Sequence, residues 1–135
     1  MPVEFLFEDL PNLVEYEIGK IRRMVPFGKL SVLYFHTKNE TDRDRIHNLL
    51  KNVLRESDAI IIKDNNFFLV LPLTDKEGAE FVYEGIKGFF EKEFPKVIAC
   101  YPGDADNARD LLNKILSNAK SEYDYLESFF MQDRF

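Results

Sequence analysis

The spacing of hydrophobic positions changes along the chain and predicts the order of its elements. Residues 8–25 place apolar side chains three and four positions apart, as in a helix that buries one face. Leu30–Phe35 is a short apolar run rich in β-forming residues, which is typical of a buried strand. Thr41 or Asp42 is expected to cap a second helix that extends to about Leu54. The first part of the chain therefore predicts helix, strand, helix.

The rest of the chain predicts a hairpin, a helix, a strand and a long final helix. The ranges are Ala59–Lys63 and Phe67–Leu71 for the hairpin strands, Asp75–Phe94, Lys96–Tyr101, and a helix from about Ala105 to near Phe130. The connections are short, and no repeat or linker interrupts them. We expect a single α+β domain over 1–135, with a ferredoxin-like mixed sheet of about four strands packed with helices.

Composition narrows the class of protein. The 135 residues are 45% hydrophobic and 31% charged, as in an ordinary soluble domain. The net charge of −6 argues against a protein that binds nucleic acid through its phosphates. No apolar run approaches the ~20 residues of a membrane span, and no signal peptide is evident. A single cysteine excludes a disulfide framework and a thiolate zinc site, so a cytoplasmic protein is expected.

Five motifs occur in an order that resembles a known family. The stretch from Arg55 to Glu80 contains Arg-x-x-Asp, a strand, a polar turn, a strand, Leu-Pro and an acidic helix start. The others are Leu10-Pro11-Asn12, the segment 21–35, the segment IACYPGDADNARDLL at 98–112, and Ala119-Lys120. Together they resemble the GGDEF family, the diguanylate cyclase domains of bacterial signalling, over about residues 7–120. The resemblance implies a nucleotidyl cyclase-like core.

The signature turn departs from the family pattern. It corresponds to Lys63-Asp64-Asn65-Asn66-Phe67, or to the same window one residue later, and both glycines are absent in either frame. Side chains at those positions would obstruct a nucleotide. The acidic metal-binding position is Asn65 or Asn66, and an amide supplies no charge to balance Mg²⁺.

The family's second metal-binding acid is also replaced. It falls at the end of the first predicted strand, where the sequence reads Phe35-His36-Thr37. Phosphoryl transfer depends on positioned metals, so we expect no catalytic residue, no bound metal and no cofactor.

One motif of the family is intact, namely Arg55-Glu56-Ser57-Asp58. In the family, Arg-x-x-Asp upstream of the turn binds cyclic di-GMP as an inhibitory site, and the resemblance implies that role for Arg55 and Asp58. A planar guanidinium suits guanine edges and phosphates. The alternative is an ion pair at the end of a helix.

Other candidate groups have ordinary interpretations. His36 and His47 are eleven positions apart and have no cluster of metal ligands nearby. Cys100 lies in an apolar strand and is expected to be buried. Asp104 and Asp106 are expected at the start of the last helix, where carboxylates favour the helix dipole.

These observations lead to one function and two alternatives. The leading interpretation is a catalytically inactive GGDEF-like domain that acts as a binding or regulatory module in bacterial signalling, through contact with another protein. The first alternative is a cyclic di-GMP receptor that uses Arg55 and Asp58. The second is an enzyme with residual nucleotide chemistry.

The C-terminal extension, residues 121–135, is unusually aromatic. Five of these fifteen residues are Phe or Tyr, a third against 14% for the whole chain, so several rings would be costly to leave in water. We expect Leu126 and Phe130 to be buried. The extension would either pack on its own domain or form a surface for self-association or a protein partner.

Overall fold

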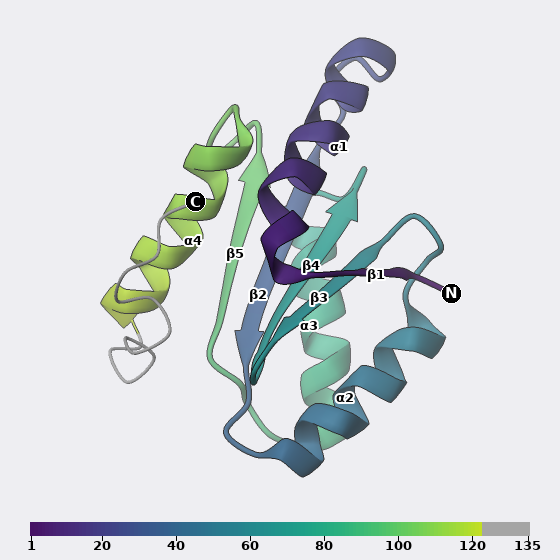
Figure 1. Cartoon of the computed structure of the whole chain (residues 1–135), viewed down its shortest axis with the longest axis vertical. Helices are drawn as coiled ribbons and strands as arrows, with labels where there is room; N and C mark the ends of the chain where they lie inside the picture. Colours follow the sequence, from purple (N-terminus) through teal and green to yellow (C-terminus); the bar gives the residue numbers. More distant parts are fainter. Residues whose placement is uncertain (123–135) are drawn as a thin grey trace.

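The computed structural model describes residues 1–122 (Figure 1). Its elements, in chain order, are β1 (Val3–Phe5), a 3-10 turn (Phe7–Asp9), α1 (Leu10–Met24), β2 (Leu30–His36), α2 (Glu40–Val53), β3 (Ala59–Lys63), β4 (Asn66–Pro72), α3 (Lys76–Phe90), β5 (Lys96–Tyr101) and α4 (Ala108–Glu122). The predicted α+β class and the hairpin strands are confirmed. None of the helices in this part of the chain is long and apolar enough to cross a membrane.

The strands form a mixed sheet in the order β1-β3-β4-β2-β5. β2 is antiparallel to both of its neighbours, β4 and β5, and β3 is antiparallel to β4. The expectation of about four strands omitted β1, which pairs parallel to β3 with Val3 opposite Ala59. β1 has three residues, all exposed, so it has no buried face from which hydrophobic periodicity could predict it.

Helices cover both faces of the sheet, with α1 and α4 on one side and α2 and α3 on the other (Figure 1). Alternate residues of β2 therefore enter two separate cores: Val32 and Tyr34 face α1 and α4, whereas Leu33 and Phe35 face α2 and α3. Because both faces of β2 are buried, its sequence is a continuous apolar run rather than an alternating one.

The helix ends differ from the predicted ones for local reasons. The cap of α2 is Asn39, whose side chain accepts from the Asp42 backbone N–H at 3.0 Å, and not Thr41 or Asp42. α3 ends at Phe90 because Glu91 takes a left-handed conformation, so Phe94 lies beyond the helix.

The final helix begins at Ala108 rather than Ala105 and continues past Lys120 to Glu122. The start moves because Asn107 supplies the cap: its side-chain oxygen accepts from the Asp110 backbone N–H at 2.9 Å. The predicted burial of Leu126 and Phe130 lies outside the described residues.

The cap of α2 gives a direct test of this geometry. Replacing Asn39 with Ala removes the acceptor for one backbone N–H and should lower the free energy of unfolding by about 1 kcal/mol. Thr41→Ala, at the position that the sequence predicted as a cap, should change it by less than about 0.5 kcal/mol. Urea denaturation followed by circular dichroism measures both, and equal losses would contradict the assignment.

Candidate functional site

The hairpin between β3 and β4 is closed by a two-residue turn. Lys63 pairs with Asn66, leaving Asp64 and Asn65 at the tip. The predicted hairpin therefore has a tight turn. Asp64 has a φ of 55°, the left-handed conformation that aspartate and asparagine adopt more readily than most residues.

The side chain of Asn66 points into the protein and is hydrogen-bonded on both sides. Its Oδ1 accepts from the Tyr34 hydroxyl at 2.6 Å and lies 3.1 Å from His36 Nδ1, while its Nδ2 donates to the Lys63 carbonyl. An amide oxygen only accepts, so His36 must carry its proton on Nδ1 to bond there. The three side chains tie the end of β2 to the start of β4.

His36 is held in its neutral form. Burial lowers its pKa below the ordinary 6.5, the hydrogen bond with Asn66 opposes that shift, and the positive charge of Lys38 adds to it. At neutral pH the ring is therefore an uncharged hydrogen-bonding group.

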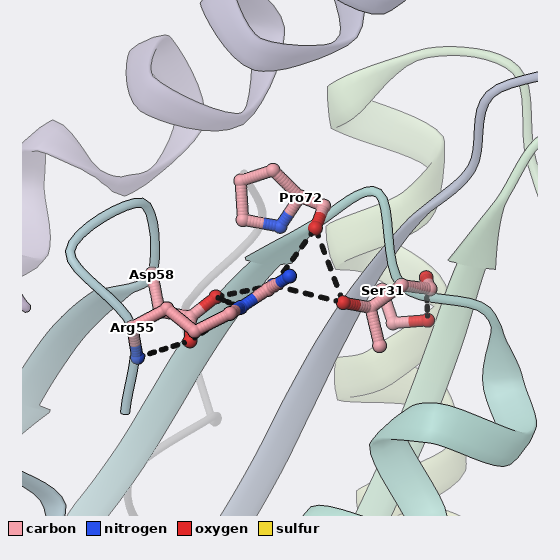
Figure 2. Close-up of polar contacts among 5 residues, drawn as sticks. Ser31, Arg55, Asp58 and Pro72 are labelled. Atoms are coloured by element: carbon pink, nitrogen blue, oxygen red, sulfur yellow. Dashed lines mark hydrogen bonds and ion pairs between the residues drawn. The ribbon is translucent and has the colours of Figure 1, made fainter. Parts of the chain in front are cut away.

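Arg55 and Asp58 form a closed ion pair at the junction of α2 and β3 (Figure 2). The Asp58 carboxylate accepts from the Arg55 guanidinium at 2.7 Å and from the Arg55 backbone N–H at 2.8 Å. The same guanidinium donates to the Pro72 carbonyl at 2.9 Å and to the Thr74 hydroxyl at 3.0 Å. The motif therefore fastens the start of β3 to the end of β4.

This arrangement limits how a ligand could use the motif. The Asp58 side chain is only 3% exposed and so is not accessible to an outside molecule in this arrangement, whereas the Arg55 side chain is 52% exposed. Hydrogen bonding to Asp58 raises the pKa of Arg55. Thr74, which accepts from this guanidinium, also lines a hollow of about 410 Å³ together with Asp75. The ion-pair interpretation describes the observed contacts, and cyclic di-GMP binding remains a prediction.

The turn and the Arg55 motif lie at opposite ends of the same hairpin. The turn connects Lys63 to Asn66, while Arg55 contacts the far end of β4 at Pro72. Asn66 and Pro72 stand at the two ends of β4, six residue steps apart, which corresponds to roughly 20 Å. The structure therefore does not bring the two predicted sites into one pocket.

The remaining candidates have structural partners. His47 pairs with Glu4 at 2.6 Å, whereas His36 is hydrogen-bonded to Asn66. Cys100 is buried, as expected.

The expected helix start at Asp104 and Asp106 is wrong, because Asn107 caps α4. Asp104 instead accepts from the Cys100 backbone N–H and pairs with Lys76 at 2.9 Å. Burial would raise its pKa, but these bonds, together with Lys114, hold it below the ordinary value.

Comparison with known proteins gives matches only among solved structures. No protein-family description and no curated protein matches the chain. A DGC protein from Thermotoga maritima superposes with a TM-score of 0.66 and 20% identity, covering 87% of this chain and 93% of that one. A sensory box/GGDEF family protein from Caulobacter crescentus CB15 gives a TM-score of 0.59 and 11% identity, covering 87% and 94%.

The chain has a GGDEF-like fold. The expected cyclase-like core is thus confirmed at the level of architecture. The superpositions show the fold alone, because identities of 11% and 20% are too low to show that the chemistry is shared.

The residues at the GGDEF-like turn do not fit a divalent metal. Hard cations prefer charged oxygen donors, and the Asn66 oxygen is neutral and already bonded by Tyr34. In the adjoining hollow of about 320 Å³, the Asp42 carboxylate is paired with Lys92 at 2.6 Å. Among residues 1–122, no three His, Cys, Asp or Glu side chains are grouped as metal ligands would be.

Sequence reasoning missed the partners that organise both sites. At the turn, the missed partner is Tyr34, which donates to Asn66. At the Arg55 motif, the missed partners are Pro72 and Thr74, which accept from Arg55. Buried Ser31 in turn donates to the Thr74 carbonyl. A signal was present: Ser31 and Tyr34 are polar residues in an otherwise apolar buried strand, and buried polar atoms need partners.

The pKa of His36 predicts a pH dependence. As pH falls, the unfolded chain takes up a proton at this ring before the folded chain does. The contribution of His36 to the free energy of unfolding should therefore decline below about pH 6.5 and be constant above it.

NMR titration should give a His36 pKa below 6.5. Lys38→Gln should move it upward, because a lysine charge that lowers it is gone. Lys29→Gln, at the opposite end of β2, is the control and should not shift it.

Proposed function

We propose that this chain is a GGDEF-like domain without cyclase activity that works as a binding or regulatory module in bacterial signalling. The observation that supports the loss of activity is the Asn66 side chain, which points inward and is bonded by Tyr34 and His36. Where the resemblance places metal-binding acids, this chain has an internal hydrogen-bond cluster.

The chemistry of phosphoryl transfer supports the same proposal. Joining two nucleoside triphosphates requires cations that neutralise their phosphates and a protein backbone that can approach the nucleotides closely. Here the tip of the turn carries the side chains of Asp64 and Asn65 instead of glycines. Asp64 is exposed, and one carboxylate alone is a poor site for a metal.

A cyclic di-GMP receptor is the second candidate, and a different observation favours it. The Arg55 side chain is 52% exposed and donates to the Thr74 hydroxyl, and Thr74 also lines the 410 Å³ hollow. Binding through both residues of the motif would require the Asp58 carboxylate, which is only 3% exposed, to exchange its bonds with Arg55 for bonds to the ligand. Those bonds must be broken first, so we rank this candidate second.

Incubation with GTP tests the loss of activity. With Mg²⁺ or Mn²⁺ present, chromatography should show no new nucleotide product, while an active diguanylate cyclase run in parallel does. Asp64→Asn removes the carboxylate at the tip and should leave this result unchanged. A product that forms with the unmodified chain and disappears in Asp64→Asn would establish residual nucleotide chemistry instead.

Calorimetric titration with cyclic di-GMP separates the two binding candidates. We expect no heat of binding at ligand concentrations of about tens of micromolar. If heat is observed, Arg55→Lys decides its origin, because lysine keeps the charge but loses the planar fork. Binding that is lost in Arg55→Lys would make the chain a cyclic di-GMP receptor, and protein contact would no longer be the leading role.

A further inference from the structure

An apolar groove runs between α2 and α3 on the side facing away from the sheet. It has a volume of about 340 Å³, and its lining residues are all apolar or glycine. They include Val53 on α2 and Phe81, Gly85 and Phe89 on α3. Val53 is 59% exposed, Phe81 69% and Phe89 58%. Soluble domains rarely leave several large apolar side chains together in water, so this groove is a candidate interface.

The α3 side of the groove has a regular arrangement. Phe81, Gly85 and Phe89 are four residues apart and form one line along the helix, with the glycine midway between the rings. A Cβ added at Gly85 would meet nothing within 4 Å, so the fold itself does not require glycine there. Glycine in a helix interior is less favourable than alanine. At the surface, Gly85 leaves a gap between the two exposed phenylalanines.

We propose that a second copy of this chain docks on this surface, with the two α3 helices antiparallel about a two-fold axis at Gly85. Because the rings lie four residues before and four residues after the glycine, this symmetry places Phe81 beside Phe89 of the second copy, and the reverse pair forms at the same time. The absence of a side chain at Gly85 lets the helices approach closely. Such a self-complementary patch is the form of a two-fold interface.

The exposed area indicates that the interface between the two copies would be small. A buried phenylalanine covers 150–250 Å², so the exposed parts of these two rings amount to roughly 250 Å² per copy. With Val53 and the groove walls, a dimer would bury on the order of 1,000 Å² in total, at the lower end for specific interfaces. The dimer should therefore be weak and concentration-dependent, with a Kd of roughly tens of micromolar.

Two glycine variants of the full chain separate docking from stability. Gly85→Ala should raise Tm, because alanine favours the helix and its methyl group has space, yet weaken the dimer about tenfold. Gly19→Ala is the matched control: Gly19 is also inside a helix, on α1, with nothing within 4 Å of an added Cβ. It should raise Tm and leave the dimer unchanged. Sedimentation equilibrium over about a hundredfold concentration range measures the Kd.

Charged variants test the antiparallel register. Phe81→Glu and Phe89→Lys should each be monomeric alone, and mixing them should restore a dimer, because the new carboxylate then lies beside the new ammonium. A wild-type chain that stays monomeric at all concentrations would overturn the proposal. So would a dimer that is unaffected by Gly85→Ala and Phe81→Glu. A monomer whose Tm falls on Phe81→Glu would show that the groove is filled from within the chain, which also overturns it.

Discussion

Strand β2 is hydrogen-bonded along both edges, to β4 and β5, and buries side chains on both faces. A strand in that position cannot leave either face in water, so the chain must supply a helical layer on each side. The same strand ends at His36, beside the hairpin turn, and begins at Leu30, opposite Pro72, which Arg55 contacts. Each candidate site is thus placed by one end of β2.

The fold was predictable where burial leaves a periodic pattern. The long apolar runs of β2 and β4 and the helical stripes of α1 and α3 could be assigned correctly because each buries a continuous face. β1 could not, since its three exposed residues are ordered by backbone bonds to β3. The cap at Asn39 was missed because Thr41 and Asp42 are equally good capping residues two and three positions later.

The candidate sites were predictable in identity but not in geometry. The sequence shows that asparagines replace acids at the turn and that Arg55 stands three residues before Asp58. It does not show that Asn66 turns inward, because that depends on Tyr34, which lies 32 residues away along the chain. Nor does it show that Arg55 reaches Pro72, 17 residues on. Contacts of this length follow from strand register, which sequence periodicity alone leaves open.

The Arg55 loop also holds the N-terminus, through the backbone of Asp58. The Asp58 carbonyl accepts from the Val3 N–H at 3.2 Å, while the Asp58 side chain holds Arg55, which in turn holds Pro72 and Thr74 just before α3. The first strand, which also pairs with β3, and the residues just before α3 are therefore fastened to the same loop.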